Sequence, residues 1–172
     1  MQKPIVCAAG EGERVFYDGG LLTFKATGEQ TAGALLAFEV RMPNGKATPL
    51  HVHPEADEML YLLDGSIRVH LEGSDDAIVA AGGLALVPRG TPHAFVVESG
   101  EARILVVFTP SSAISEQFFR LAGEPASHPT AAPPPADAER FAAAAERAGL
   151  RVLGLSPFTP VEDVPVPASA GS

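Results

Sequence analysis

Short apolar runs separated by turn residues fill the chain between residues 13 and 109. The stretches "ALLAFEVRM", "EMLYLL", "SIRVHL", "HAFVVE" and "ARILVVF" are rich in β-branched and aromatic residues, and Gly, Pro, Asn and Asp occupy the gaps between them. Many short strands at close spacing are typical of an all-β sandwich or barrel. In "LLDGSIRV", the pair Asp64-Gly65 predicts a two-residue turn that joins its flanking strands into a hairpin.

The pattern changes after residue 110. In "SSAISEQFFRLAG" the apolar residues Ile114, Phe118 and Leu121 recur at helical spacing, and "DAERFAAAAERAGL" predicts a second helix. The expected ends are Ser112 and Gly123 for the first helix, and Asp137 and Gly149 for the second. The stretch "EPASHPTAAPPPAD", with His128, predicts an extended linker, and the Pro-rich end "PFTPVEDVPVPASAGS" predicts a frayed tail. We therefore expect a β-barrel over residues 1–110 and a C-terminal helical extension over residues 111–172.

Composition narrows the classes of function. The chain has 172 residues and a formal net charge of −9, which argues against nucleic-acid binding and against anionic membrane surfaces. No apolar run approaches the roughly 18 residues of a membrane span. The single cysteine, Cys7, excludes an internal disulfide and fits a cytoplasmic location.

Candidate metal chemistry lies in "HVHPEADEMLYLLDG", residues 51–65. On a strand, His51 and His53 point to the same face with their Cα atoms about 6.5–7 Å apart. Glu58 has the opposite parity, and a bend at Pro54 would bring it to that face. Downstream, His93 opens the next strand in "VPRGTPHAFVV". Three histidines and one carboxylate would form an open site for a divalent transition metal. The alternative is a pair of half-exposed histidines beside a surface acid.

The spacing of these residues resembles the first sequence motif of the cupins. That motif consists of a glycine, an H-x-H pair, a glutamate and a closing glycine. The matching residues here, at the family's spacing, are Gly45, His51, His53, Glu58 and Gly65.

The second cupin motif follows at the family's spacing. Its members here are Gly82, Pro88, Gly90 and His93, whereas the family's final asparagine is replaced by Val97. The resemblance covers residues 33–109 and implies a small jelly-roll β-barrel, often dimeric. It also implies that His51, His53, Glu58 and His93 are metal ligands. Replacement of the asparagine leaves this ligand set complete and makes the cavity more apolar at that point.

Within the family, the chain is most similar to the single-domain quercetin 2,3-dioxygenase-like cupins. That resemblance implies a metal-dependent dioxygenase that uses O2 on a flavonol or a similar aromatic enol or phenol, with Glu58 as the catalytic residue. The cofactor would be one divalent transition metal, drawn from Fe, Mn, Co, Ni, Cu and Zn. Two alternatives stay open. One is a non-redox metal-dependent isomerase, cyclase or lyase, and the other is a cupin that binds a small molecule without turnover.

The substrate pocket follows from strand parity. Inward-facing residues of the expected strands would line an apolar cavity suited to a flat aromatic ligand. The predicted lining residues are Leu36, Phe38, Leu60, Leu62, Phe95 and Val97. We expect a homodimer, because most soluble oligomers are symmetric dimers and an exposed sheet edge favours pairing.

Overall fold

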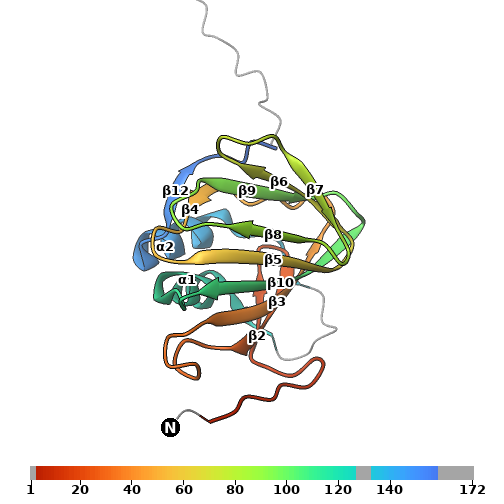
Figure 1. Cartoon of the computed structure of the whole chain (residues 1–172). Coiled ribbons are helices and arrows are strands. Elements are labelled where there is room, and N and C mark those ends of the chain that lie inside the picture. The colour runs from red at the N-terminus through yellow and green to blue at the C-terminus, as the bar shows by residue number, and fades with distance from the viewer. Residues whose placement is uncertain (1–2, 127–132, 159–172) are drawn as a thin grey trace, which may run out of the picture.

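Two antiparallel sheets face each other, and two helices lie together at one end of them (Figure 1). The computed structural model describes residues 3–126 and 133–158. In chain order the elements are β1 (Arg14–Tyr17), β2 (Gly20–Ala26), β3 (Leu36–Pro43), β4 (Leu50–Val52), β5 (Asp57–Asp64), β6 (Ser66–Leu71), β7 (Ala77–Ala80), β8 (Leu84–Val87), β9 (His93–Val97), β10 (Glu101–Thr109), α1 (Ala113–Ala122), β11 (Glu124–Pro125), α2 (Ala138–Ala148) and β12 (Arg151–Gly154).

The strand order is that of a jelly roll. One sheet has the order β11-β1-β2-β3-β10-β5-β8, and the other has the order β12-β4-β9-β6-β7. The chain crosses between the sheets after β3, β4, β5, β7, β8 and β9, and again through α2 between β11 and β12. This arrangement confirms the all-β jelly-roll barrel with a C-terminal helical extension that the sequence predicts.

Alternation along the strands builds the interior. In β3 and β10 every second residue is buried, so one face of each strand packs inward and the other faces solvent. Large fully buried side chains such as Phe38, Phe108, Leu60, Leu62 and Ile104 form one core between the sheets. Strand β9 contributes Phe95 and Val97 to this core, and Val52 of β4 is buried as well.

The hairpin expected at Asp64-Gly65 is wrong. Strand β5 pairs with β10 and β8, whereas β6 pairs with β9 and β7 in the opposite sheet. Gly65 does make the turn, with φ at +75°, and a Cβ there would lie 2.2 Å from the carbonyl oxygen of Glu101. The chain therefore turns a corner between two sheets at this point, because both strands bury apolar faces that need different partners.

The two C-terminal helices begin and end where the sequence predicts. The side chain of Ser112 caps α1 and that of Asp137 caps α2, while Gly123 and Gly149 follow their last residues. Both helices belong to the same core as the barrel, through Phe118 of α1 and three alanines of α2. Residues 127–132 of the predicted linker, with His128, and the predicted tail from residue 159 lie outside the described residues.

The extension is also joined to the sheets by backbone pairing. Strand β11 pairs with β1, and β12 pairs with β4, where Val152 lies opposite His51. The segment after α2 therefore runs directly beside a strand that carries a predicted metal ligand.

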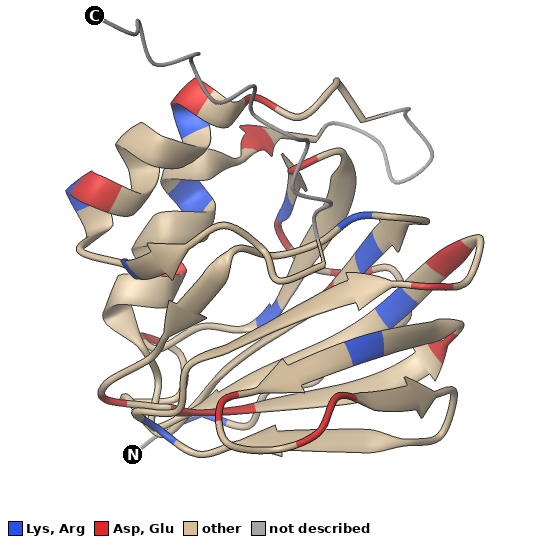
Figure 2. Ribbon diagram, turned by 90° about the horizontal axis from the view of Figure 1, so that it is seen from above, with Lys and Arg blue, Asp and Glu red and all other residues tan. Residues whose placement is uncertain are grey.

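Charged side chains are distributed over the whole molecule. Lys and Arg positions lie among Asp and Glu positions on both sheets and on the helices (Figure 2). Many of them form ion pairs, such as Arg41 with Glu101 and Arg68 with Glu98. Within the described part of the chain, no helix is long and apolar enough to cross a membrane.

Candidate metal centre

Three separate parts of the barrel bring the four predicted ligands together. His51 lies on β4 and His53 follows the end of that strand, while Glu58 is near the start of β5 and His93 opens β9. His51 and His93 are direct partners across the β4–β9 pair. Between His53 and Glu58 the chain passes from one sheet to the other. This change of direction brings Glu58 to the face of the histidines, although an odd number of residues separates it from His53.

The four side chains are buried and close. Their ligand atoms all lie within 4.8 Å of one another, and their exposed fractions are 9% for His51, 7% for His53, 6% for Glu58 and 1% for His93. Ligand atoms about 2.0–2.2 Å from one ion can be at most about 4.4 Å apart. A small inward shift would therefore bring all four donors to a single ion.

Each imidazole is held through its Nδ1 atom. In His51 this atom donates to the carbonyl of Pro49 at 2.9 Å, and in His93 it donates to the carbonyl of Thr91 at 2.9 Å. In His53 it lies 3.3 Å from the hydroxyl of Ser115. An acceptor at Nδ1 favours the proton on that nitrogen and makes Nε2 the atom that would bind a metal.

Glu58 is the charged member of the cluster. Its Oε2 atom lies 2.7 Å from Nε2 of His93 and 3.4 Å from Nε2 of His53. Burial alone would raise the pKa of the Glu58 carboxyl, but the adjacent imidazoles of His53 and His93 hold it well below its usual value. The carboxylate is therefore ionised at neutral pH.

The pKa values of His51 and His93 are shifted in opposite directions. Burial, together with the neighbouring imidazoles, lowers the pKa of His51 to about 4, so this ring is neutral at pH 7. Burial would also lower the pKa of His93, but its bond to Glu58 outweighs burial and raises it.

The structure also shows that the donor set fits a metal. Nε2 of His53 is buried without a hydrogen-bond partner among the described residues, although it lies within ion-pair distance of Glu58. A buried ring nitrogen without a partner is costly unless something satisfies it. Three imidazole nitrogens and one carboxylate oxygen suit a divalent transition metal with open positions left for substrate.

Two contacts fasten the loops that carry the ligands. The carboxylate of Asp57 accepts hydrogen bonds from the backbone and the guanidinium of Arg89, in the loop before His93. In the same loop, the backbone N–H of Gly90 donates to the carbonyl of His53 at 2.9 Å. The loops around His53 and His93 are thus joined, which fixes the distance between ligands from different strands.

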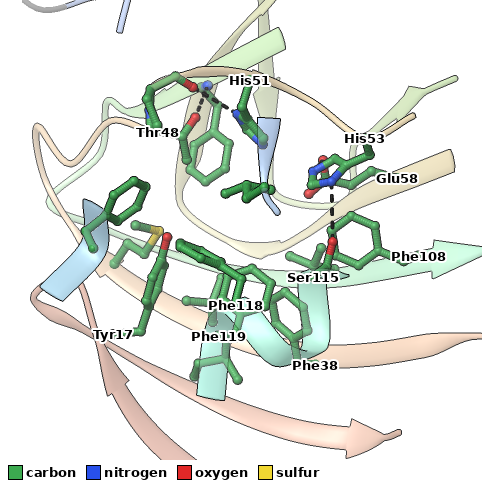
Figure 3. Close-up of a pocket in the computed structure, with 18 residues that line it drawn as sticks. Tyr17, Phe38, Thr48, His51, His53, Glu58, Phe108, Ser115, Phe118 and Phe119 are labelled. Carbon is green, nitrogen blue, oxygen red and sulfur yellow. Dashed lines mark hydrogen bonds and ion pairs between the residues drawn. The ribbon is translucent and has the colours of Figure 1, made fainter. Parts of the chain in front are cut away.

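An aromatic cavity lies beside the cluster, with a volume of about 50 Å³ (Figure 3). His51, His53 and Glu58 lie along one side of it, and Tyr17, Phe38, Phe118 and Phe119 lie across from them. Its wall is formed by Tyr17, Leu22, Phe38, Val40, Met42, Thr48, Pro49, His51, His53, Glu58, Phe95, Val106, Phe108, Ser115, Phe118, Phe119, Phe141 and Leu150.

The predicted pocket residues fall into two groups. Phe38 and Phe95 line the cavity, whereas the other four are buried in the core and are absent from its wall. Those four are Leu36, Leu60, Leu62 and Val97. The two sheets approach each other where β5 contacts β7 and β10 contacts β6, and buried side chains fill the space between them at that end. Parity correctly indicates that these side chains face inward, but it does not indicate how far along the barrel the cavity extends.

Several cavity residues lie outside the cupin motifs. Tyr17 comes from β1, Ser115, Phe118 and Phe119 come from α1, and Phe141 comes from α2. The helical periodicity of "SSAISEQFFRLAG" indicated that α1 has an apolar face, but it did not indicate which part of the barrel that face covers. No sequence signal singled out Tyr17.

Among the polar residues that line the cavity, Tyr17 is the farthest in sequence from the two cupin motifs. It is 7% exposed and lines the cavity, and its hydroxyl has no hydrogen-bond partner among the residues that the structure describes. Burial, with a smaller contribution from the charges of Asp18 and Glu58, raises the pKa of the phenol well above its usual value. The hydroxyl is therefore a neutral donor that faces an apolar space.

Comparison with known proteins agrees with this geometry. Residues 38–108 match the family model described as a cupin domain. The chain is 32% identical over 153 residues to quercetin 2,3-dioxygenase of Bacillus subtilis (strain 168), covering 87% of this chain and 44% of that protein. The chain therefore spans less than half the length of this curated relative.

Solved structures with the same fold are more distant in sequence. A predicted oxalate decarboxylase from Thermotoga maritima is 20% identical with a TM-score of 0.54, over 62% of this chain and 99% of that one. An RmlC-like cupin from Shewanella frigidimarina is 20% identical with a TM-score of 0.53, over 64% of this chain and 95% of that one. At this identity the likeness supports the fold alone.

Proposed function

Because the chain belongs to the cupin superfamily, we propose that it is a metal-dependent dioxygenase that acts on a flavonol or a similar aromatic enol or phenol. One observation carries the proposal. A buried three-histidine, one-carboxylate cluster forms one side of a cavity whose other walls are largely aromatic. The similarity to a quercetin 2,3-dioxygenase supports the same class of substrate.

The ligands of the proposed metal are His51, His53, Glu58 and His93. A divalent transition metal bound there would supply a centre at which a substrate oxygen and O2 are brought together. The donor set is compatible with Fe, Mn, Co, Ni, Cu and Zn, and metal availability in the cell decides among such ions as much as affinity does.

Glu58 is the proposed proton acceptor. Its carboxylate is ionised and borders the cavity, where it would meet the acidic hydroxyl of an enol or phenol. Nε2 of His93 lies 2.7 Å from Oε2 of Glu58, and a metal held by both residues would keep the carboxylate in one orientation while it takes the substrate proton. The same residue is a proposed metal ligand, and a carboxylate can serve both roles through its two oxygens.

The aromatic walls would hold and orient the ring system. Phe118 and Phe119 pack edge to face with each other and with Tyr17, and Phe38 packs edge to face with Phe119. This arrangement leaves ring faces and edges available to a flat ligand. The apolar wall also excludes water from the reacting atoms.

Substrate entry requires the wall to move. The cavity of about 50 Å³ is well below the roughly 300–1,000 Å³ of pockets that enclose drug-sized ligands. Phe141 and Leu150 close the wall from α2 and the segment after it. We infer that a flavonol enters by displacing this part of the C-terminal extension.

Tyr17 offers a second point of attachment. Its hydroxyl would donate to an oxygen of the substrate, while the metal holds an oxygen at the other end of the ligand. A substrate with two separated oxygens on a flat aromatic frame meets both requirements.

The test combines metal analysis with O2 uptake. Purified protein is reconstituted with each metal and assayed with a panel of flavonols. We expect uptake that depends on metal and is lost in Glu58→Gln, while Glu39→Gln, on the outer face of β3, behaves as wild type. Metal binding without O2 uptake would contradict the dioxygenase. It would favour the non-redox isomerase or cyclase, or a binding cupin, which anaerobic ligand screens would separate.

The expected homodimer and cytoplasmic location stay predictions from the sequence. Exposed apolar side chains on β7 and β8, including Ile78, Leu84 and Leu86, lie at sheet edges where another chain could pair. Sedimentation of the purified protein would decide the oligomeric state.

A further inference from the structure

Ser115 lies beside the metal cluster but belongs to neither cupin motif. It is on α1, outside residues 38–108, and its side chain is 1% exposed. Its hydroxyl oxygen lies 3.3 Å from Nδ1 of His53, and a dashed line marks this contact in Figure 3.

We propose that Ser115 is a positioning residue for the metal site, which accepts a hydrogen bond from His53 and thereby presents Nε2 of that ring to the metal. The inference rests on the metal site of the proposed function and not on the dioxygenase reaction. It assigns to the C-terminal extension a direct part in holding the metal.

The tautomer argument carries the proposal. A ring that binds a metal through Nε2 must carry its proton on Nδ1, and this proton needs an acceptor. His51 and His93 use backbone carbonyls for this purpose, at Pro49 and Thr91. His53 uses a side-chain hydroxyl instead, and the described residues offer its Nδ1 no other acceptor.

The contacts of the His53 ring agree with this role. Its Nε2 is the buried side-chain atom without a hydrogen-bond partner among the described residues, whereas its Nδ1 is engaged by Ser115. The ring of Phe108 packs against the imidazole in a T-shaped contact, with the ring centroids 4.7 Å apart. The ring is thus held in place by Ser115 and by packing, with its unpartnered nitrogen turned toward Glu58.

The helix that carries Ser115 is itself firmly placed. The hydroxyl of Ser112 accepts a hydrogen bond from the backbone N–H of Ser115 at 3.0 Å, and Glu116 accepts one from the backbone of Gly28 at 3.0 Å. Phe118 and Phe119, one turn further along, pack against Tyr17. One helix therefore sets both the cavity wall and the orientation of His53.

The experiment compares Ser115→Ala with Ser112→Ala in the full chain. Alanine has the higher helix propensity, so Ser115→Ala removes the acceptor without weakening α1. Ser112→Ala removes the helix cap, whose loss loosens α1, and leaves the hydroxyl beside His53 intact. The measurements are the dissociation constants of Co²⁺ and Zn²⁺ from competition with a chelator, the visible spectrum of the Co²⁺ protein, and the melting temperature of the metal-free protein.

We expect Ser115→Ala to weaken metal binding about 10- to 100-fold and to change the Co²⁺ spectrum, since loss of a partner that orients a ligand has effects of this size. Ser112→Ala should lower the melting temperature and bind metal as wild type does.

Three results would overturn the inference. In the first, Ser115→Ala binds Co²⁺ and Zn²⁺ like wild type, and only the role of Ser115 fails. In the second, both variants weaken binding equally, which would assign the effect to helix packing and not to the hydroxyl. In the third, the wild-type protein takes up neither metal, and the metal site of the proposed function fails as well.

Discussion

His51→Ala and His93→Ala should destabilise the metal-free protein by different amounts, although both residues are proposed metal ligands. His93 is 1% exposed and its Nε2 lies 2.7 Å from Oε2 of Glu58. His51 is neutral, with a pKa of about 4, and its hydrogen bond goes to the carbonyl of Pro49. His93→Ala therefore removes the close partner of a buried carboxylate, whereas His51→Ala does not.

The expected sizes follow from these contacts. Removing one partner of a buried charge pair costs about 3–5 kcal/mol, and we expect the lower end because Glu58 can take up a proton instead. A domain of this size loses about 2–4 °C in melting temperature per kcal/mol, so His93→Ala should melt roughly 6–12 °C below wild type. His51→Ala leaves a neutral acceptor without a partner, which costs about 1–2 kcal/mol and lowers the melting temperature by roughly 2–8 °C.

Added metal should raise the melting temperature of wild type but not that of either variant. A ligand present at 100 times its dissociation constant stabilises the folded state by about 2.7 kcal/mol, which raises the melting temperature by roughly 5–11 °C. Neither variant should show this shift, since each lacks one of four ligands.

The assay is thermal unfolding followed by circular dichroism, with and without Zn²⁺. His70→Ala is the matched control, because His70 lies on β6 away from the cluster and pairs with Asp76. The reasoning is refuted if His51→Ala destabilises the metal-free protein more than His93→Ala does, or if either variant keeps the full metal-induced shift.

Three further predictions concern the cavity and the cluster. Tyr17→Phe should weaken quercetin binding about 2- to 12-fold, the worth of one hydrogen bond, and leave the binding of unsubstituted 3-hydroxyflavone unchanged in anaerobic titrations. Equal effects on both flavonols would contradict the anchoring role. Metal affinity should fall as pH falls, because protons compete with the metal for the ligands. As the pH falls, His93, whose pKa is raised, is protonated before His51, whose pKa is about 4. Metal retention measured by dialysis from neutral pH to about pH 4 would show this loss, and full retention at the acid end would contradict it. Phe141→Ala should speed quercetin association in stopped-flow mixing by opening the wall. Its cost in stability includes the T-shaped contact with Phe118, worth about 0.5–1.5 kcal/mol, and the lost apolar burial of the ring. An unchanged rate would show that α2 does not control entry.

Local signals in the sequence predicted the helices well. Ser112 and Asp137 cap their helices, and Gly123 and Gly149 follow them, because capping depends on hydrogen bonds within a few residues of the helix end. The same local reasoning failed at Asp64-Gly65. The turn is present, but the choice of partner strands depends on the burial of whole faces and not on the turn residues.

The ligand set was visible in the sequence because its spacing is fixed by the strands that carry it. His51 and His53 are two residues apart, and Glu58 and His93 occupy the expected places in two ordered motifs. Such spacing can be recognised in the sequence, since a metal site needs donors at the ends of particular strands. Parity likewise predicted that Leu60 and Leu62 face inward, although it could not separate core from cavity wall.

The sequence by itself therefore determined the jelly-roll barrel, the helix ends and the four proposed metal ligands. Only the tertiary structure decided that Ser115 reaches His53, that Tyr17 faces the cavity, and that β12 pairs with the strand of His51. The physical reason is the range of the interactions. Strand alternation, caps and motif spacing act over a few residues or along one strand, whereas these contacts join segments far apart in the chain whose approach depends on how both sheets and both helices pack.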